Sequence, residues 1–163
     1  MNDYGKPWEK MTNRERKRIH TAVHECGHAI VAKYLGMRVD HIRLEPHPTI
    51  PSSGWVGAFL PGELDHEKAC TLAVAGFVAT ALIMKGADEV NKESGQRDRK
   101  QALEYARAAL LEKGGEPTET DVQAFMYACM RRAERILLDN LEEHKRLHLA
   151  LLKHGSAKMK RVS

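Results

Sequence analysis

The sequence predicts a single domain that is mainly α-helical with a small β-sheet (α+β). Long segments with apolar residues at helical spacing flank one short central segment that is alternating or rich in β-formers. With 163 residues, the chain is long enough to bury a core without disulfides or metal ions as staples. Hydrophobic residues at 42% and charged residues at 29% are typical of a globular protein. We expect the domain to span residues 12–153, between a flexible tail at 1–11 and a basic tail at 154–163.

The first helix is expected to begin at Thr12 or Asn13, since either residue is a good N-cap, and to stop at Gly36. Apolar residues recur along it at helical spacing and predict a buried stripe. The stripe comprises Ile19, Val23, Cys26, Ile30 and Tyr34. Two or three short strands are predicted next, within residues 39–46 and 54–61, because turn-forming residues separate these two segments.

Three further helices are predicted. Asp65 is a plausible N-cap for an apolar helix that runs to about Lys85. A polar loop at 86–96 leads to a helix that starts near Asp98. The last helix opens after Thr118 as one long amphipathic segment whose apolar stripe reaches Leu147.

Composition and motifs exclude several classes of function. Three widely spaced cysteines without a CxxC pair argue against a disulfide framework and a cysteine zinc site, so a reducing, cytoplasmic setting is expected. The N-terminus has no apolar signal region. The longest apolar run, Ala69–Met84, is shorter than the roughly 18–20 residues of a membrane span and predicts a core helix. No GxxxxGKS or GxxxxGKT loop indicates nucleotide binding.

The modest net charge of +4 and a basic cluster at Arg14–Arg18 raise the question whether the chain binds nucleic acid. A solvated helix start explains such a cluster more simply. Strongly salt-dependent DNA affinity would be the signature of the alternative. We therefore do not expect a nucleic-acid partner.

The segment His24–His28 reads HExxH. On a helix, residues four apart project from one face, so two imidazoles can reach a single ion. Glu25 would lie beside the open coordination position and could take a proton from a water that zinc makes acidic. A chance match has a probability of about four per cent, so the motif needs support from a third ligand. Gly27 costs about 1 kcal/mol inside a helix and is expected where another backbone passes close.

A catalytic zinc ion usually takes three protein ligands. The next histidine, His41, does not follow at the spacing of a third histidine ligand. Acidic candidates lie further on, at Asp88, Glu89, Glu93 and Asp98. A helix start would aim Asp98 back at the core, but the chemistry of these residues leaves the choice open.

Other residues have competing structural explanations. His144 and His148, four apart in a charged stretch, are expected on a solvated face. His20 is expected to have a surface or core role rather than a role in the site, since nothing in the sequence fixes its partner. Trp55 could contact substrate or simply pack in the fold.

Four segments together resemble the peptidase domain of FtsH-type ATP-dependent metalloproteases. "TAVHECGHAIVAKYL" resembles the zinc-binding helix of that family. "GWVGAFLP", "VAGFVATALIM" and "SGQRDRKQALEYAR" follow in the same order and resemble its strand, its glycine-containing helix and its third-ligand segment. The resemblance covers roughly residues 12–153 and implies a zincin-like helical metalloprotease domain with HExxH on the first long helix. It puts the third ligand at Asp98.

The resemblance implies a zinc endopeptidase with one ion per chain, held by His24, His28 and Asp98, and with Glu25 as general base. The polypeptide substrate would lie extended along the edge strand. Its candidate contacts there are Trp55, Val56 and Gly57. The family's ATPase module has no counterpart in this sequence. The substrate would therefore be unfolded, flexible or delivered by a partner, either a separate ATPase or a homo-oligomer.

The sequence departs from the family pattern at two places, and the first of these favours an alternative. Residues 75–81 replace a charged family stretch, and Arg99 stands where the family has an apolar residue. The alternative is a catalytically weak or inactive regulatory or binding module that keeps the metal site.

Overall fold

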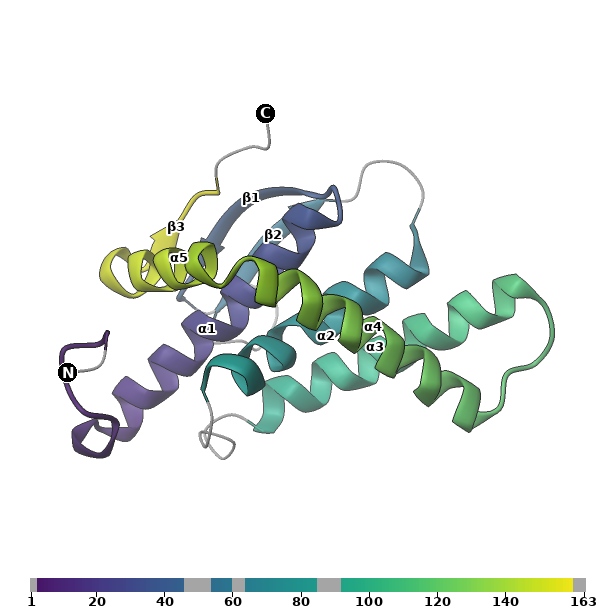
Figure 1. Ribbon diagram of the computed structural model, residues 1–163, viewed down its shortest axis with the longest axis horizontal. Helices are drawn as coiled ribbons and strands as arrows, with labels where there is room; N and C mark the ends of the chain where they lie inside the picture. The colour runs from purple at the N-terminus through teal and green to yellow at the C-terminus, as the bar shows by residue number, and fades with distance from the viewer. Residues whose placement is uncertain (1–2, 46–53, 60–63, 85–91, 160–163) are drawn as a thin grey trace.

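The computed structural model describes residues 3–45, 54–59, 64–84 and 92–159 and confirms a mainly α-helical fold with a small sheet (Figure 1). Helix α2 lies at the centre and packs against α1, α3 and α4, while the sheet and α5 pack against α1. In order, the elements are a short 3-10 helix at Trp8–Lys10, α1 Asn13–Tyr34, β1 Arg38–Arg43, β2 Trp55–Phe59, α2 His66–Ile83, α3 Lys92–Lys113, α4 Glu119–Asp139, α5 Leu141–His154 and β3 Ser156–Ala157.

Helix α1 begins and ends close to where the sequence predicts. Thr12 forms a capping box: its hydroxyl accepts from the amide of Glu15 at 3.2 Å, and the Glu15 carboxylate accepts from the amide of Thr12 at 2.6 Å. The predicted stripe is buried except at its end. Tyr34 is 47% exposed, and its hydroxyl donates to Glu143, so its assignment to the core is wrong.

Helix α2 begins after the predicted cap, Asp65, whose carboxylate accepts from the amide of Lys68 at 3.0 Å. Of the described helices, it is the one whose length and apolar composition would allow a membrane crossing. The core helix of a globular protein passes the same test. Contacts with three other helices bury half of α2, which gives it the role of a core helix in this fold.

The sheet is antiparallel in the order β2-β1-β3, so β2 is paired with a described strand on one side only. Ile42 of β1 pairs with Val56 of β2 and with Ala157 of β3. Strand β3 lies in the segment that the sequence assigns to a basic tail. Two residues are too few to show an alternating pattern, and the strand forms because Gly155, at φ 73°, turns the chain after α5.

Helix α3 begins at Lys92, so the prediction of a loop through residue 96 and a helix start near Asp98 is wrong. The first turns carry almost no apolar residues and therefore show no periodicity, although Lys, Glu, Gln and Arg are good helix formers. Asp98 consequently lies inside the helix. The rival candidates Asp88 and Glu89 lie outside the described residues, as does the side chain of Glu93.

The single long helix predicted after Thr118 is in fact two, because the backbone breaks at Asn140 (φ −130°, ψ 26°). The break turns α5 back onto α1. His144 and His148 are therefore 0% and 3% exposed, and their prediction as a solvated face is wrong. Nε2 of His144 donates to the carbonyl of Val23 at 2.9 Å, and Nε2 of His148 accepts from the hydroxyl of Tyr4 at 3.2 Å.

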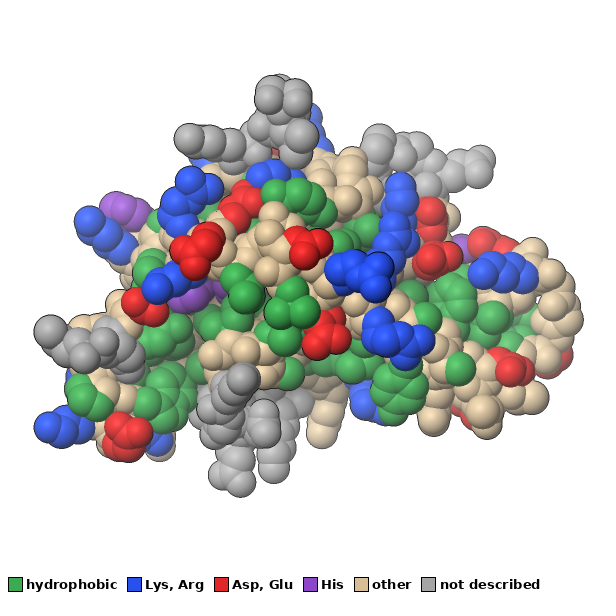
Figure 2. All heavy atoms as spheres, viewed as in Figure 1, with side chains coloured by type: hydrophobic (Ala, Val, Ile, Leu, Met, Phe, Trp, Pro, Cys, Tyr) green, Lys and Arg blue, Asp and Glu red, His purple; other side chains and the backbone are tan. Residues whose placement is uncertain are grey.

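In the N-terminal segment, Tyr4 and Trp8 pack partly buried against the core. Arg16, from the basic cluster, lies over the Trp8 ring, and Arg18 donates to the carbonyl of Leu152. Both arginines thus have structural contacts. On the face drawn in Figure 2, basic and acidic side chains are interspersed.

Candidate metal centre

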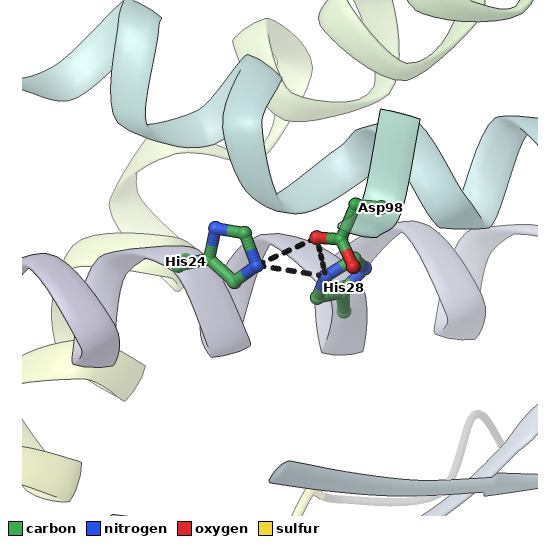
Figure 3. A group of neighbouring side chains, drawn as sticks. All are labelled: His24, His28 and Asp98. Carbon is green, nitrogen blue, oxygen red and sulfur yellow. Dashed lines mark hydrogen bonds and ion pairs between the residues drawn. The ribbon is translucent and has the colours of Figure 1, made fainter. Parts of the chain in front are cut away.

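Helices α1 and α3 bring His24, His28 and Asp98 together, and Figure 3 shows the two imidazoles and the carboxylate converging. Asp98 Oδ2 lies 2.8 Å from Nε2 of His24 and 3.2 Å from Nε2 of His28. The two Nε2 atoms are 3.2 Å apart. The side chains are 5–14% exposed, so the group is largely shielded from water.

These distances fit a divalent metal ion. Tetrahedral zinc with bonds of about 2.0–2.1 Å holds its ligand atoms about 3.3 Å from one another. The three distances between the ligand atoms are 2.8, 3.2 and 3.2 Å, slightly shorter than this spacing. Two nitrogens and one oxygen are also a donor set that zinc commonly takes.

A backbone carbonyl on α2 fixes the tautomer of His28. Its Nδ1 donates to the carbonyl of Leu72 on α2 at 2.8 Å, so the lone pair of neutral His28 is on Nε2 and faces the other two ligands. In that tautomer Nε2 and the carboxylate oxygen of Asp98 are both acceptors. Such a pair needs a cation between them, either a proton or a metal ion.

The ionisation of the group follows from this geometry. Burial lowers the pKa of His28, but the hydrogen bond and the charge of Asp98 outweigh it and raise that pKa to about 9. Burial opposes ionisation of Asp98, yet hydrogen bonds from His24 and His28 bring its pKa well below the ordinary value. Without a metal ion, a proton therefore holds His28 to Asp98, and metal binding displaces that proton.

Two glycines let α1 and α2 approach closely at the site. A Cβ on Gly76 of α2 would overlap the imidazole of His24 and lie 2.6 Å from Nε2 of His28. A Cβ on Gly27 of α1 would lie 2.5 Å from the Cβ of Ala79 and 2.7 Å from the carbonyl oxygen of Ala75. The close backbone expected beside Gly27 is thus confirmed. The role of Gly76 was missed, although a glycine inside an apolar helix is a signal of the same kind.

Glu25 lies under the start of β2. A Cβ on Gly54 would come within 2.9 Å of the Cγ of Glu25, so the chain that enters β2 passes directly over this side chain. Burial raises the pKa of Glu25, while its electrostatic interactions with the neighbouring imidazoles lower it. The carboxyl group is therefore partly buried and electrostatically coupled to the metal ligands.

The remaining sequence candidates are distributed around this group. His20 is 7% exposed and its ring stacks on that of His24, with centroids 6.3 Å apart, so it is buried directly beside a metal-ligand candidate. Trp55, Val56 and Gly57 form the first part of β2. Gly57 lies opposite His41, whose imidazole occupies the space that a side chain at residue 57 would need.

Residues 7–87 match the family model described as Peptidase M50B-like. The match spans just under half of the chain and contains His24, Glu25 and His28, whereas Asp98 lies beyond it. The comparison with curated proteins gives no match. The family match and the metal-ligand group together support a metallopeptidase-like function. The matched family is not that of the FtsH-type peptidases, so the match supports the broader class alone.

Proposed function

We propose that this chain is a zinc-dependent endopeptidase that hydrolyses peptide bonds of unfolded or flexible polypeptides. The observation that carries the proposal is the meeting of His24 Nε2, His28 Nε2 and a carboxylate oxygen of Asp98 within 4.8 Å of one another. Three protein ligands leave a fourth zinc position for water or substrate, which is the arrangement of catalytic rather than structural zinc sites. The Peptidase M50B-like match supports the same class of reaction.

Zinc held by His24, His28 and Asp98 would supply a Lewis acid for the scissile carbonyl and would lower the pKa of bound water. The chain itself must supply a base, and Glu25 is the residue next to the ligands that can do so. Because burial raises the pKa of Glu25, its carboxylate takes up a proton more readily than an exposed glutamate. Glu25 would then pass this proton to the leaving amine.

Strand β2 is the proposed binding edge for the substrate. A described strand pairs with it on one side only, and Gly54 brings its start over Glu25. An extended peptide that added to β2 would run past the base and the metal ligands. Val56 and Gly57 would bind it mainly through backbone groups, which favours extended polypeptides over folded proteins.

The FtsH-type assignment, the cytoplasmic setting and delivery of the substrate by a separate ATPase or within a homo-oligomer remain parts of this proposal. They rest on the resemblance of the motifs around His24 and Asp98 and on cysteine usage.

The test compares native protein with Glu25→Gln and Asp98→Ala, with Glu104→Gln on the exposed side of α3 as the matched control. We expect one zinc per native chain and cleavage of an unfolded protein. Glu25→Gln should keep the zinc and lose cleavage by at least about 100-fold. Asp98→Ala should lose both, and the control neither.

Full cleavage by Glu25→Gln would refute the assigned base. Zinc binding by native protein without any cleavage would instead support the binding or regulatory module.

A further inference from the structure

Two cysteines that are far apart in the sequence lie together in the core, away from the metal ligands. Cys70 is on α2 and Cys129 is on α4, and these helices pack against each other. The two side chains are 0% and 3% exposed and belong to the same apolar cluster. The third cysteine, Cys26, is buried in a different cluster beside the sheet.

The contacts of Cys129 place its sulfur against one turn of α2. Its Sγ lies 3.9 Å from the carbonyl oxygen of Glu67, one turn before Cys70. The side chains of Thr71 and Cys70 lie close enough to Cys129 to lower its pKa. Three neighbouring residues of α2 thus surround one thiol of α4.

The two thiols are not equivalent. The single thiol hydrogen of Cys70 is donated to the carbonyl of Ala102 at 3.3 Å, and it can turn to the sulfur of Cys129 when that sulfur is a thiolate. The hydrogen bond from Cys70 lowers the pKa of Cys129, and the same bond together with burial raises the pKa of Cys70. In such a pair the thiol with the lower pKa is the nucleophile, and the other can resolve its oxidation product.

The two thiols are buried, and an exposed ion pair joins α2 and α4 close to them. Arg132 of α4 and Glu67 of α2 form an ion pair of 3.4 Å over the same two turns, and both side chains are nearly half exposed. Movement of these surface side chains would open the path to Cys129, which lies one turn away from Arg132.

We propose that Cys70 and Cys129 are a redox-sensitive modification site, at which a peroxide oxidises the two thiols to a disulfide that joins α2 to α4. The Cys129 thiolate attacks one peroxide oxygen, the O–O bond breaks, and a sulfenic acid and one water form. The Cys70 sulfur then attacks the sulfenic sulfur, the S–S bond forms, the S–O bond breaks, and a second water leaves. The thiols lose two electrons and two protons, and hydrogen peroxide is reduced to two molecules of water.

The disulfide would act on a helix that also supports the metal ligands. Leu72, two residues after Cys70, accepts the hydrogen bond from His28, and Gly76 faces both histidines. Oxidation would remove the thiol hydrogen that Cys70 donates to Ala102, one turn after Asp98 on α3. The cysteine pair thus lies where α2, α3 and α4 contact one another.

The experiment treats the folded native chain with hydrogen peroxide, blocks remaining thiols, and maps the cysteines by mass spectrometry after digestion. We expect a mass loss of two hydrogens, a linked peptide pair that contains Cys70 and Cys129, and reversal by a dithiol reductant. Cys26 should stay a free thiol. No oxidation, irreversible sulfinic or sulfonic acid as the main product, or linkage through Cys26 would overturn the proposal.

Two controls connect the result to the fold. In the urea-unfolded chain the pairing should become unselective, and equally selective pairing there would contradict a structural origin. Cys70→Ala should accumulate a sulfenic acid on Cys129 that dimedone captures, whereas Cys129→Ala should leave Cys70 unmodified. The opposite pattern would refute the assigned nucleophile. If either variant fails to fold, the mapping of the native chain still decides.

Discussion

Replacing Gly76 by alanine tests the metal site without changing any ligand. The new Cβ would overlap Cε1 and Nε2 of His24 and lie 2.6 Å from Nε2 of His28, whereas carbon atoms pack at about 3.5–4.0 Å. A relief of about 1 Å is therefore needed. The imidazole of His28 cannot provide it easily, because its Nδ1 is bonded to the Leu72 carbonyl. Helix α2 cannot retreat freely either, since Gly27 fits closely against it.

The expected cost falls on metal binding. Overpacking costs about 1–3 kcal/mol in folding free energy, and alanine recovers about 1 kcal/mol of helix propensity. The metal-free chain should thus lose only about 0–2 kcal/mol. Zinc affinity should fall about 10–100-fold, the range seen when groups that orient metal ligands are disturbed.

Competition with a chromophoric chelator measures the affinity, and thermal unfolding with and without zinc measures the stability. Gly95→Ala is the matched control, because a Cβ on this α3 glycine meets no atom within 4 Å. It should leave zinc affinity unchanged. Native-like zinc affinity in folded Gly76→Ala would refute the argument that the ligand histidines need this glycine.

Two further predictions concern stability. Burial lowers the pKa of His144 and of His148 to about 4, below the unfolded value of about 6.5. Between pH 4 and 6.5 the unfolded chain therefore binds more protons than the folded chain. As a result, the free energy of unfolding falls as the pH drops from 6.5 to 4. In metal-free protein, His144→Leu should reduce the slope of the free energy of unfolding against pH by up to about 1.4 kcal/mol per pH unit. The same substitution at the exposed His154 should leave that slope unchanged. Equal slopes for the two variants in denaturant titrations would contradict the burial argument. Thr118→Ala removes the capping box of α4 and should lower the free energy of unfolding by about 1 kcal/mol in chemical denaturation. If Thr118→Ala lowered this free energy less than substitution of the exposed Thr120 by alanine, the role of the cap would be contradicted.

Local signals in the sequence predicted several elements correctly. Thr12 and Asp65 begin the helices that they were expected to cap, because side-chain oxygens at these positions accept from backbone amides a few residues ahead. The spacing of His24 and His28 within a helix was enough to place both imidazoles on one face. Two short strands follow from local β-propensity and turn residues in the same way.

Signals that depend on distant partners were weaker. The first turns of α3 are polar on all sides, so the sequence placed the helix start six residues late. The alternating pattern of a two-residue strand cannot be recognised, and β3 depends both on the turn at Gly155 and on the edge that β1 offers it. The break at Asn140 reversed the expectation for His144, whose burial depends on where α5 is directed.

The sequence by itself determined the helical scaffold and the pair of histidines, because both depend on interactions within a few residues. The chemistry of the acidic residues left the third ligand open, and only a family resemblance pointed to Asp98; the tertiary structure brings it to the histidines, since the packing of α3 across α2 sets that distance. It also showed why Gly76 and the Leu72 carbonyl matter: each acts on an imidazole from another helix. Contacts of this kind depend on how helices pack, and residue spacing along one chain does not encode them directly.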